Sequence, residues 1–235
     1  MFLPLHDRNA LRFIPFQVVT VGLIAVNVVV FVWQQSLSGD AAITTVFSGG
    51  LTPATLFGNA PVPPIYDVLP QPLTLVTHMF LHGSWLHLIS NMVFLWVFGD
   101  NVEEAMGPLR FLVFYWACGI AAGRAHAVMQ PDSVAPLVGA SGATSGIVGA
   151  YLLLFPRIQV WVLILFRLPW RLPAYGLLIA WLAFQVYFAV WGPPSSSAWW
   201  AHIGGFFAGL VLVPLFKRRD VPLFRAEESP RFDTV

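Results

Sequence analysis

The chain has 235 residues, of which 57% are hydrophobic and only 10% are charged, and its mean hydropathy is +0.74. Soluble domains carry charge at roughly 25% of their positions, so this composition excludes an ordinary water-soluble protein. The net charge of +1 gives no basis for nucleic-acid binding. Cys118, the single cysteine, excludes an intrachain disulfide and a cysteine metal cluster.

Six apolar segments qualify as membrane-spanning helices, because about 20 apolar residues in a helix match the thickness of the hydrocarbon layer. No cleavage site of small residues follows the first segment, so we expect it to be retained rather than removed as a signal peptide. The pattern predicts an all-α membrane protein with a six-helix domain over residues 14–216, preceded by a segment 1–13 and followed by a polar tail 217–235. The predicted spans are Ile14–Trp33, Ser84–Phe98, Leu109–Met129, Val138–Phe155, Pro173–Trp191 and Trp199–Phe216.

Two further segments are not expected to span. Val160–Phe166 is apolar but only seven residues long, and Arg157, Arg167 and Arg171 surround it, so we expect it to lie along the membrane interface. The segment from Gln34 to His78 is rich in Gly and Pro and shows no obvious secondary structure. Such long connections often have a function or contact the membrane.

The basic residues orient the predicted bundle. With six spans, Arg124 alone falls on one side and the other eleven basic residues fall on the side of both termini. Cytoplasmic loops are enriched in Lys and Arg, so both termini are predicted to be cytoplasmic. The eleven residues are Arg8, Arg12, Arg110, Arg157, Arg167, Arg171, Lys217, Arg218, Arg219, Arg225 and Arg231.

Polar residues cluster where they are costly, within or next to predicted spans. His82 lies just before the second span and His87 and Asn91 lie in it, while Ser141 lies in the fourth span and His202 in the sixth. These three spans should all run from outside to inside, and each polar residue lies near the outer end. At ~1.5 Å rise per residue, the side chains should share a layer within about 10 Å of the outer surface.

Small residues form a stripe on each of the fourth and sixth predicted spans, and such stripes let transmembrane helices approach closely. Taken alone, the stripes are more simply explained as packing motifs. A serine on one stripe and a histidine at matched depth on the other favour a functional site. The stripes are Ser141, Ser145 and Gly149 on the fourth span, and His202, Gly205 and Gly209 on the sixth.

This combination suits nucleophilic catalysis. A serine hydroxyl attacks a carbonyl only when a base takes its proton, and histidine is the usual base. None of the eleven acidic residues lies in a predicted span, so we expect a Ser141–His202 dyad without a carboxylate. His87 and Asn91, four residues apart, could stabilise the oxyanion together with the Ser141 backbone amide. Asn91 alone would more simply form a hydrogen bond between helices.

Four strings resemble the rhomboid family of intramembrane serine proteases: HGSWLHLISNM (82–92), FGDNVEEAMGPLRF (98–111), GASGATSG (139–146) and AHIGGFFAG (201–209). The resemblance implies a six-helix fold and cleavage of transmembrane substrates near the ends of their helices, often at small residues. By position, the resemblance implies that Ser141 is the nucleophile and His202 the base. It also implies that His87 and Asn91 donate to the oxyanion. His82 would be a structural histidine, and the supporting glycines would be Gly139, Gly142 and Gly205.

Two positions depart from the family pattern. Leu73-Thr74 replaces a Trp-Arg pair that many relatives have in the first loop, which leaves the anchoring of this loop open. Ser145 stands where some relatives have an aromatic residue that stacks on the histidine. The resemblance therefore does not indicate what orients His202.

The expected partners are transmembrane protein substrates and the lipid bilayer, with no nucleic acid, no metal and no cofactor. The compact six-span form suggests a bacterial inner membrane. Three alternatives have less support in the sequence. An inactive rhomboid-like protein that binds membrane clients generally lacks the serine or the histidine. A haem or metal site on His78, His82, His87 and His202 has no supporting HExxH motif, and a transporter would be expected to show internal repeats.

Overall fold

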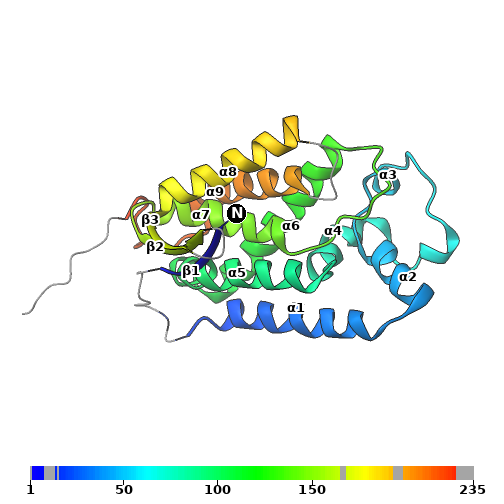
Figure 1. Cartoon of the computed structure of the whole chain (residues 1–235), viewed down its shortest axis with the longest axis horizontal. Helices are drawn as coiled ribbons and strands as arrows, with labels where there is room; N and C mark the ends of the chain where they lie inside the picture. Colours follow the sequence, from blue (N-terminus) through cyan, green and yellow to red (C-terminus); the bar gives the residue numbers. More distant parts are fainter. Residues whose placement is uncertain (1, 8–13, 15, 165–167, 193–197, 226–235) are drawn as a thin grey trace, which may run out of the picture.

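The computed structural model describes residues 2–7, 14, 16–164, 168–192 and 198–225. The long helices lie side by side, with a small sheet at one end and short helices at the other (Figure 1). Arg8, Arg12, Arg167 and Arg231, which the charge argument used, lie outside the described residues. The long helices are α1 (Val18–Ser36), α5 (Trp85–Met106), α6 (Pro108–Met129), α7 (Ser141–Leu154), α8 (Ala174–Trp191) and α9 (Trp199–Phe216).

Four of the described helices are long and apolar enough to cross a membrane: α1, α6, α8 and α9. α5 adds a fifth span when it is joined to the bent segment Gln71–Phe80, which meets it at 83°. α7 has only 14 residues, but nearly all of them are buried by other helices rather than exposed to lipid. The predicted helical membrane architecture is thereby confirmed, whereas the count of six spans stays a prediction.

α5 continues well beyond the predicted end at Phe98, although its last turns carry acidic residues. Glu103 explains how a charge is tolerated there. Its fully buried carboxylate accepts hydrogen bonds from the backbone amides of Val19 (3.0 Å) and Thr20 (2.8 Å) and from the Thr20 hydroxyl (2.8 Å). These amides belong to the first turn of α1, where no intrahelical partner exists and where negative charge is favoured.

The prediction of an all-α protein is wrong at one end of the bundle. Three antiparallel strands form a sheet in the order β1 (Phe2–Asp7), β2 (Gln159–Ile164), β3 (Leu168–Pro173). The apolar run predicted to lie along the membrane interface supplies the central strand, β2. Its alternate residues Val160 and Val162 are fully buried, as the period of two in a strand requires.

The sheet is joined to the helices through Asp7, at the end of β1. The Asp7 carboxylate accepts hydrogen bonds from Asn101 Nδ2 of α5 (3.0 Å) and from the Tyr151 hydroxyl of α7. On the sheet itself, the Arg171 guanidinium lies 4.1 Å above the Trp161 ring, across the β2–β3 pair. The start of the described chain is thus tied to two long helices.

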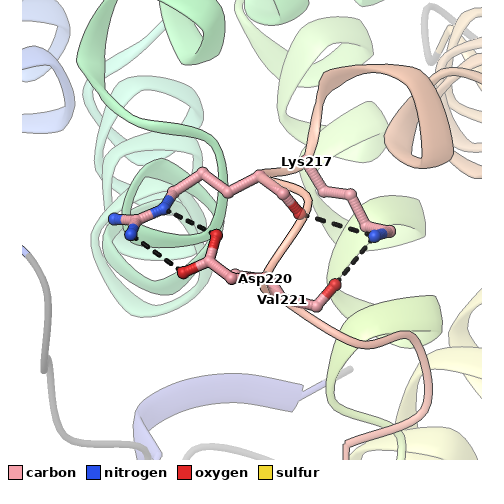
Figure 2. Close-up of polar contacts among 4 residues, drawn as sticks. Lys217, Asp220 and Val221 are labelled. Atoms are coloured by element: carbon pink, nitrogen blue, oxygen red, sulfur yellow. Dashed lines mark hydrogen bonds and ion pairs between the residues drawn. The ribbon is translucent and has the colours of Figure 1, made fainter.

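The end of the described chain lies at the same end of the molecule. Lys217 Nζ donates to the Val221 carbonyl (2.8 Å), and Arg218 holds the Asp220 carboxylate through two hydrogen bonds of 3.2 and 3.0 Å (Figure 2). The hydrogen bonds from Arg218 lower the pKa of the Asp220 carboxyl group. Arg218 N–H also donates to the Ala105 carbonyl of α5. The first part of the predicted polar tail, through residue 225, is therefore packed on the bundle.

The connection between α1 and α5 was expected to lack secondary structure, and this expectation is wrong. Thr74 is fully buried in it and donates to the Gln71 carbonyl (2.5 Å), and Thr77 Oγ1 donates to the Gly49 carbonyl (2.6 Å). These bonds anchor the loop near the position of the missing Trp-Arg pair. The elements are α2 (Gly39–Gly49), α3 (Pro53–Leu56), η1 (Pro64–Tyr66), η2 (Gln71–Leu73), α4 (Thr74–Thr77) and η3 (His78–Phe80).

Glycines bring α7 and α9 into backbone contact. A Cβ added to Gly205 would lie 2.0 Å from the Gly142 carbonyl oxygen, and one added to Gly209 would lie 1.9 Å from that of Gly146. Because the contacts advance in the same direction along both helices, α7 and α9 run parallel.

The face of α7 that meets α9 differs from the predicted stripe. Gly142, Gly146 and Gly149 make the close approach, whereas Ser141 and Ser145 were expected to make it together with Gly149. Neighbouring positions on a helix differ by about 100° around its axis, so when the glycines face α9 both serines are turned away from the contact. They point instead toward a cavity beside it.

Candidate active site

Ser141 is the first residue of α7 and is half-buried. Gly139 places it there: its φ of +123° suits glycine, and its N–H donates to the His78 carbonyl (2.8 Å). The first amides of a helix have no intrahelical acceptor, so the Ser141 backbone N–H lies where it can serve an oxyanion. The nucleophile candidate therefore sits at the positive end of a buried helix.

A cavity of about 680 Å³ opens beside Ser141. Its walls come from α5, α7, α8 and α9, with Leu172 of the segment before α8, and are mostly apolar. Three of the predicted site residues, Asn91, Ser141 and His202, line it together. The structure thus brings side chains from three distant stretches of sequence to one hollow, at a size that admits a peptide segment.

His202 lies in the first turn of α9, next to Ala201, which packs on Gly142 of α7. Its Nδ1 is 2.8 Å from Oε1 of Gln185 on α8. Two indole rings also contact the imidazole, those of Trp181 and Trp199, each with its centroid at 6.2 Å. The histidine ring is therefore held by groups on α8 and α9.

His87 and Asn91 converge on the strand-like segment before Ser141. A Cβ added to Gly139 would lie 2.7 Å from His87 Nε2 and 3.6 Å from Asn91 Nδ2. Asn91 is 6% exposed, and its Nδ2 has no hydrogen-bond partner in the protein. A buried donor that is left unpaired beside a candidate nucleophile is suited to a developing negative charge.

His82 supports this arrangement from behind. Its backbone N–H and C=O both bond to the side-chain amide of Gln34, at 3.1 and 3.2 Å. Its buried ring packs edge-on against His87, with centroids 5.2 Å apart, and against Phe31. The residue connects α1 to the start of α5 and fixes the neighbourhood of His87.

Ser145 does not take over the role of the aromatic residue that it replaces, because its hydroxyl donates to the Ser141 carbonyl (2.6 Å). Sequence reasoning missed the groups that do contact His202, namely Gln185, Trp181 and Trp199. Gln185 carried a usable signal, since it is the single amide in the otherwise apolar sequence of α8. Within the described ranges, no three His, Cys, Asp or Glu residues are grouped as a metal site would require.

The profile of the Rhomboid domain family matches residues 70–219, which is more than half of the chain and includes every residue of this site. The chain belongs to the rhomboid family. The prediction made from the four sequence strings is confirmed at this level.

Named relatives share part of this rhomboid sequence. "Rhomboid-like protease 3" of Toxoplasma gondii is 34% identical over 63% of the chain and 53% of its own length. "Rhomboid protein 1, mitochondrial" of Saccharomyces cerevisiae is 29% identical over 62% of the chain and 42% of its own length. "Rhomboid protease GluP" of Bacillus subtilis is 42% identical over 33% of the chain and 15% of its own length. The matches thus span about half or less of these relatives.

Proposed function

We propose that this rhomboid is an intramembrane serine endopeptidase with Ser141 as nucleophile and His202 as general base. One observation carries the proposal: the two side chains, 61 positions apart in sequence, line one cavity where α7 and α9 touch. No carboxylate of the described residues lines this cavity, which agrees with a Ser-His dyad rather than a triad that includes an acid.

The chemistry follows from these positions. His202 takes the Ser141 Oγ proton as the oxygen attacks the scissile carbonyl, and the carbonyl π electrons become an oxyanion. In this proposal the Ser141 amide, Asn91 Nδ2 and His87 donate hydrogen bonds to it, which the position of Asn91 and His87 beside Gly139 supports. His202 then gives the proton to the leaving amine. Water, activated by the same imidazole, hydrolyses the acyl-enzyme and restores the serine.

The substrates that fit this site are transmembrane proteins. The cavity is bounded in part by α5 and α8, and Phe94 of α5 contacts Trp181 of α8 there, with ring centroids 6.5 Å apart. A substrate helix could enter between these helices and expose a peptide bond near its end. In this proposal the chain spans a bacterial inner membrane six times, and both termini lie on the cytoplasmic side.

Covalent labelling tests the proposal against an inactive protein that only binds clients. A fluorophosphonate probe is expected to modify the wild-type protein in liposomes at one site, since only an activated serine reacts at a useful rate. Ser141→Ala should abolish labelling, as judged by in-gel fluorescence and peptide mass spectrometry. Ser145→Ala is the matched control, because Ser145 lines the same cavity, and it should still be labelled. A wild-type protein that stays unlabelled and cuts none of a panel of single-span substrates would favour the client-binding alternative.

Asn91→Ala is expected to lower kcat by about 10²-fold with little change in KM, because an oxyanion donor acts mainly in the transition state. The measurement is cleavage of a single-span substrate in liposomes. Asn91→Asp keeps the shape of the side chain but replaces the donor by a carboxylate, and it should be at least as impaired. Near-normal turnover by Asn91→Asp would assign Asn91 to helix packing instead.

A further inference from the structure

Gln185 is an unusual residue for its position. α8 reads AYGLLIAWLAFQVYFAVW, and Gln185 is its single amide among side chains that are otherwise apolar or aromatic. Burying an amide in an apolar environment is costly unless the amide is hydrogen-bonded. Gln185 is nevertheless only 4% exposed, and it lies on the inner face of a helix whose other large side chains mostly point outward. Its presence therefore needs an explanation at the site that it faces.

The amide oxygen meets the one histidine nitrogen that the proposed reaction does not use. Gln185 Oε1 lies 2.8 Å from His202 Nδ1. An amide oxygen can only accept, so Nδ1 must carry the proton in this pair. A neutral imidazole has a single N–H, and Nε2 is then left as the acceptor that a serine hydroxyl requires. The hydrogen bond selects the tautomer that can act as a base.

Two aromatic rings also contact the imidazole of His202, in addition to its hydrogen bond with Gln185. Trp181 and Trp199 contact the ring at centroid distances of 6.2 Å, at interplanar angles of 35° and 85°. Such contacts restrict where the ring lies, but they do not distinguish one nitrogen from the other. Ser145 cannot take this role, because its hydroxyl is bonded to the Ser141 carbonyl.

We propose that Gln185 is the positioning residue of the catalytic group, which fixes the tautomer and the ring orientation of His202. The inference rests on the function proposed above. In this role a neutral amide does what a carboxylate does in a three-residue group, without a buried charge. Since Gln185 belongs to α8 and His202 to α9, the base is correctly oriented only while these two helices stay packed together.

Two substitutions separate positioning from packing. Gln185→Met keeps the length and approximate volume of the side chain but removes the acceptor, whereas Gln185→Glu keeps an acceptor for Nδ1–H. Gln185→Met is expected to lower kcat and the rate of fluorophosphonate labelling by about 10- to 10²-fold with KM nearly unchanged, and Gln185→Glu should retain most of both rates. Leu178→Met, an equally buried change on α8 that does not line the cavity, is the matched control and should behave like the wild type.

A spectroscopic measurement reads the tautomer directly. The imidazole ¹⁵N signals of His202, assigned with His202→Ala, should show protonated Nδ1 and unprotonated Nε2 in the wild type. Gln185→Met should shift His202 toward the other tautomer. An Nδ1 that is unprotonated in the wild type, or signals and rates that Gln185→Met does not change, would overturn the proposal. This readout needs no turnover, so it stays informative even if the protein proves to have no protease activity.

Discussion

Ser141→Ala and His202→Ala are each expected to lower kcat by about 10⁴-fold or more, and the double variant is expected to be no slower than either single one. The two side chains act in one proton transfer, and residues that act as a unit lose their whole effect when either is removed. The measurement is single-turnover cleavage of a transmembrane substrate in liposomes, with each variant compared at saturating enzyme.

The non-additivity is the decisive part of this expectation. If the effects of the two substitutions multiplied, Ser141 and His202 would act independently, and the shared cavity would not be a dyad site. Thermal unfolding in detergent serves as the control for folding. Ser141→Ala removes a single oxygen atom, so its midpoint should change little, whereas His202→Ala leaves the buried Gln185 amide without its partner and should lower the midpoint.

Gly209→Ala is expected to lower the free energy of unfolding by about 3 kcal/mol and to abolish most of the proteolytic activity. The new methyl group would lie 1.9 Å from the Gly146 carbonyl oxygen, and backbone cannot move aside as the end of a flexible side chain can. The helices must separate, which costs packing along the α7–α9 contact and displaces Ser141 from His202. Reversible unfolding in mixed micelles measures the first effect, and substrate cleavage measures the second.

Gly22→Ala provides the matched control. Gly22 also lies in a long helix of the bundle, but a Cβ added there meets nothing within 4 Å. Alanine at an open helical position is expected to be neutral or to stabilise by about 0.5–1 kcal/mol, because it reduces the freedom of the unfolded chain. If both variants were equally stable, the glycine contact between α7 and α9 would not be a determinant of the fold.

The helices could be predicted where a single local property defines them. The sixth predicted span coincides with α9, and the third and fifth differ from α6 and α8 by one residue each. These helices are bounded by proline or by a change to polar residues, signals that lie within the segment itself. The second span was predicted shorter than α5, because the apolar sequence stops at Phe98. The helix continues beyond it, where polar side chains such as Glu103 are buried and hydrogen-bonded.

Features that depend on distant partners could not be predicted. The sheet joins Phe2–Asp7 to Gln159–Ile164, a pairing between distant parts of the sequence that no local pattern reveals. For the site, parallel even-numbered spans were enough to predict that Ser141, His202 and Asn91 would converge. The contact of Gln185 with His202 depends instead on how α8 is rotated about its axis, and the apolar sequence of α8 does not fix that rotation.

The position of β1 has a consequence for how the protein is made. Residues 2–7 are synthesised before the helices, but their strand partner ends at Ile164, and Asp7 also bonds to Asn101 and Tyr151. β1 therefore completes its contacts only after β2 and the helices between the two strands have been synthesised. Closing this strand is a late step of biogenesis. It joins β1 to α5 and α7 through Asp7.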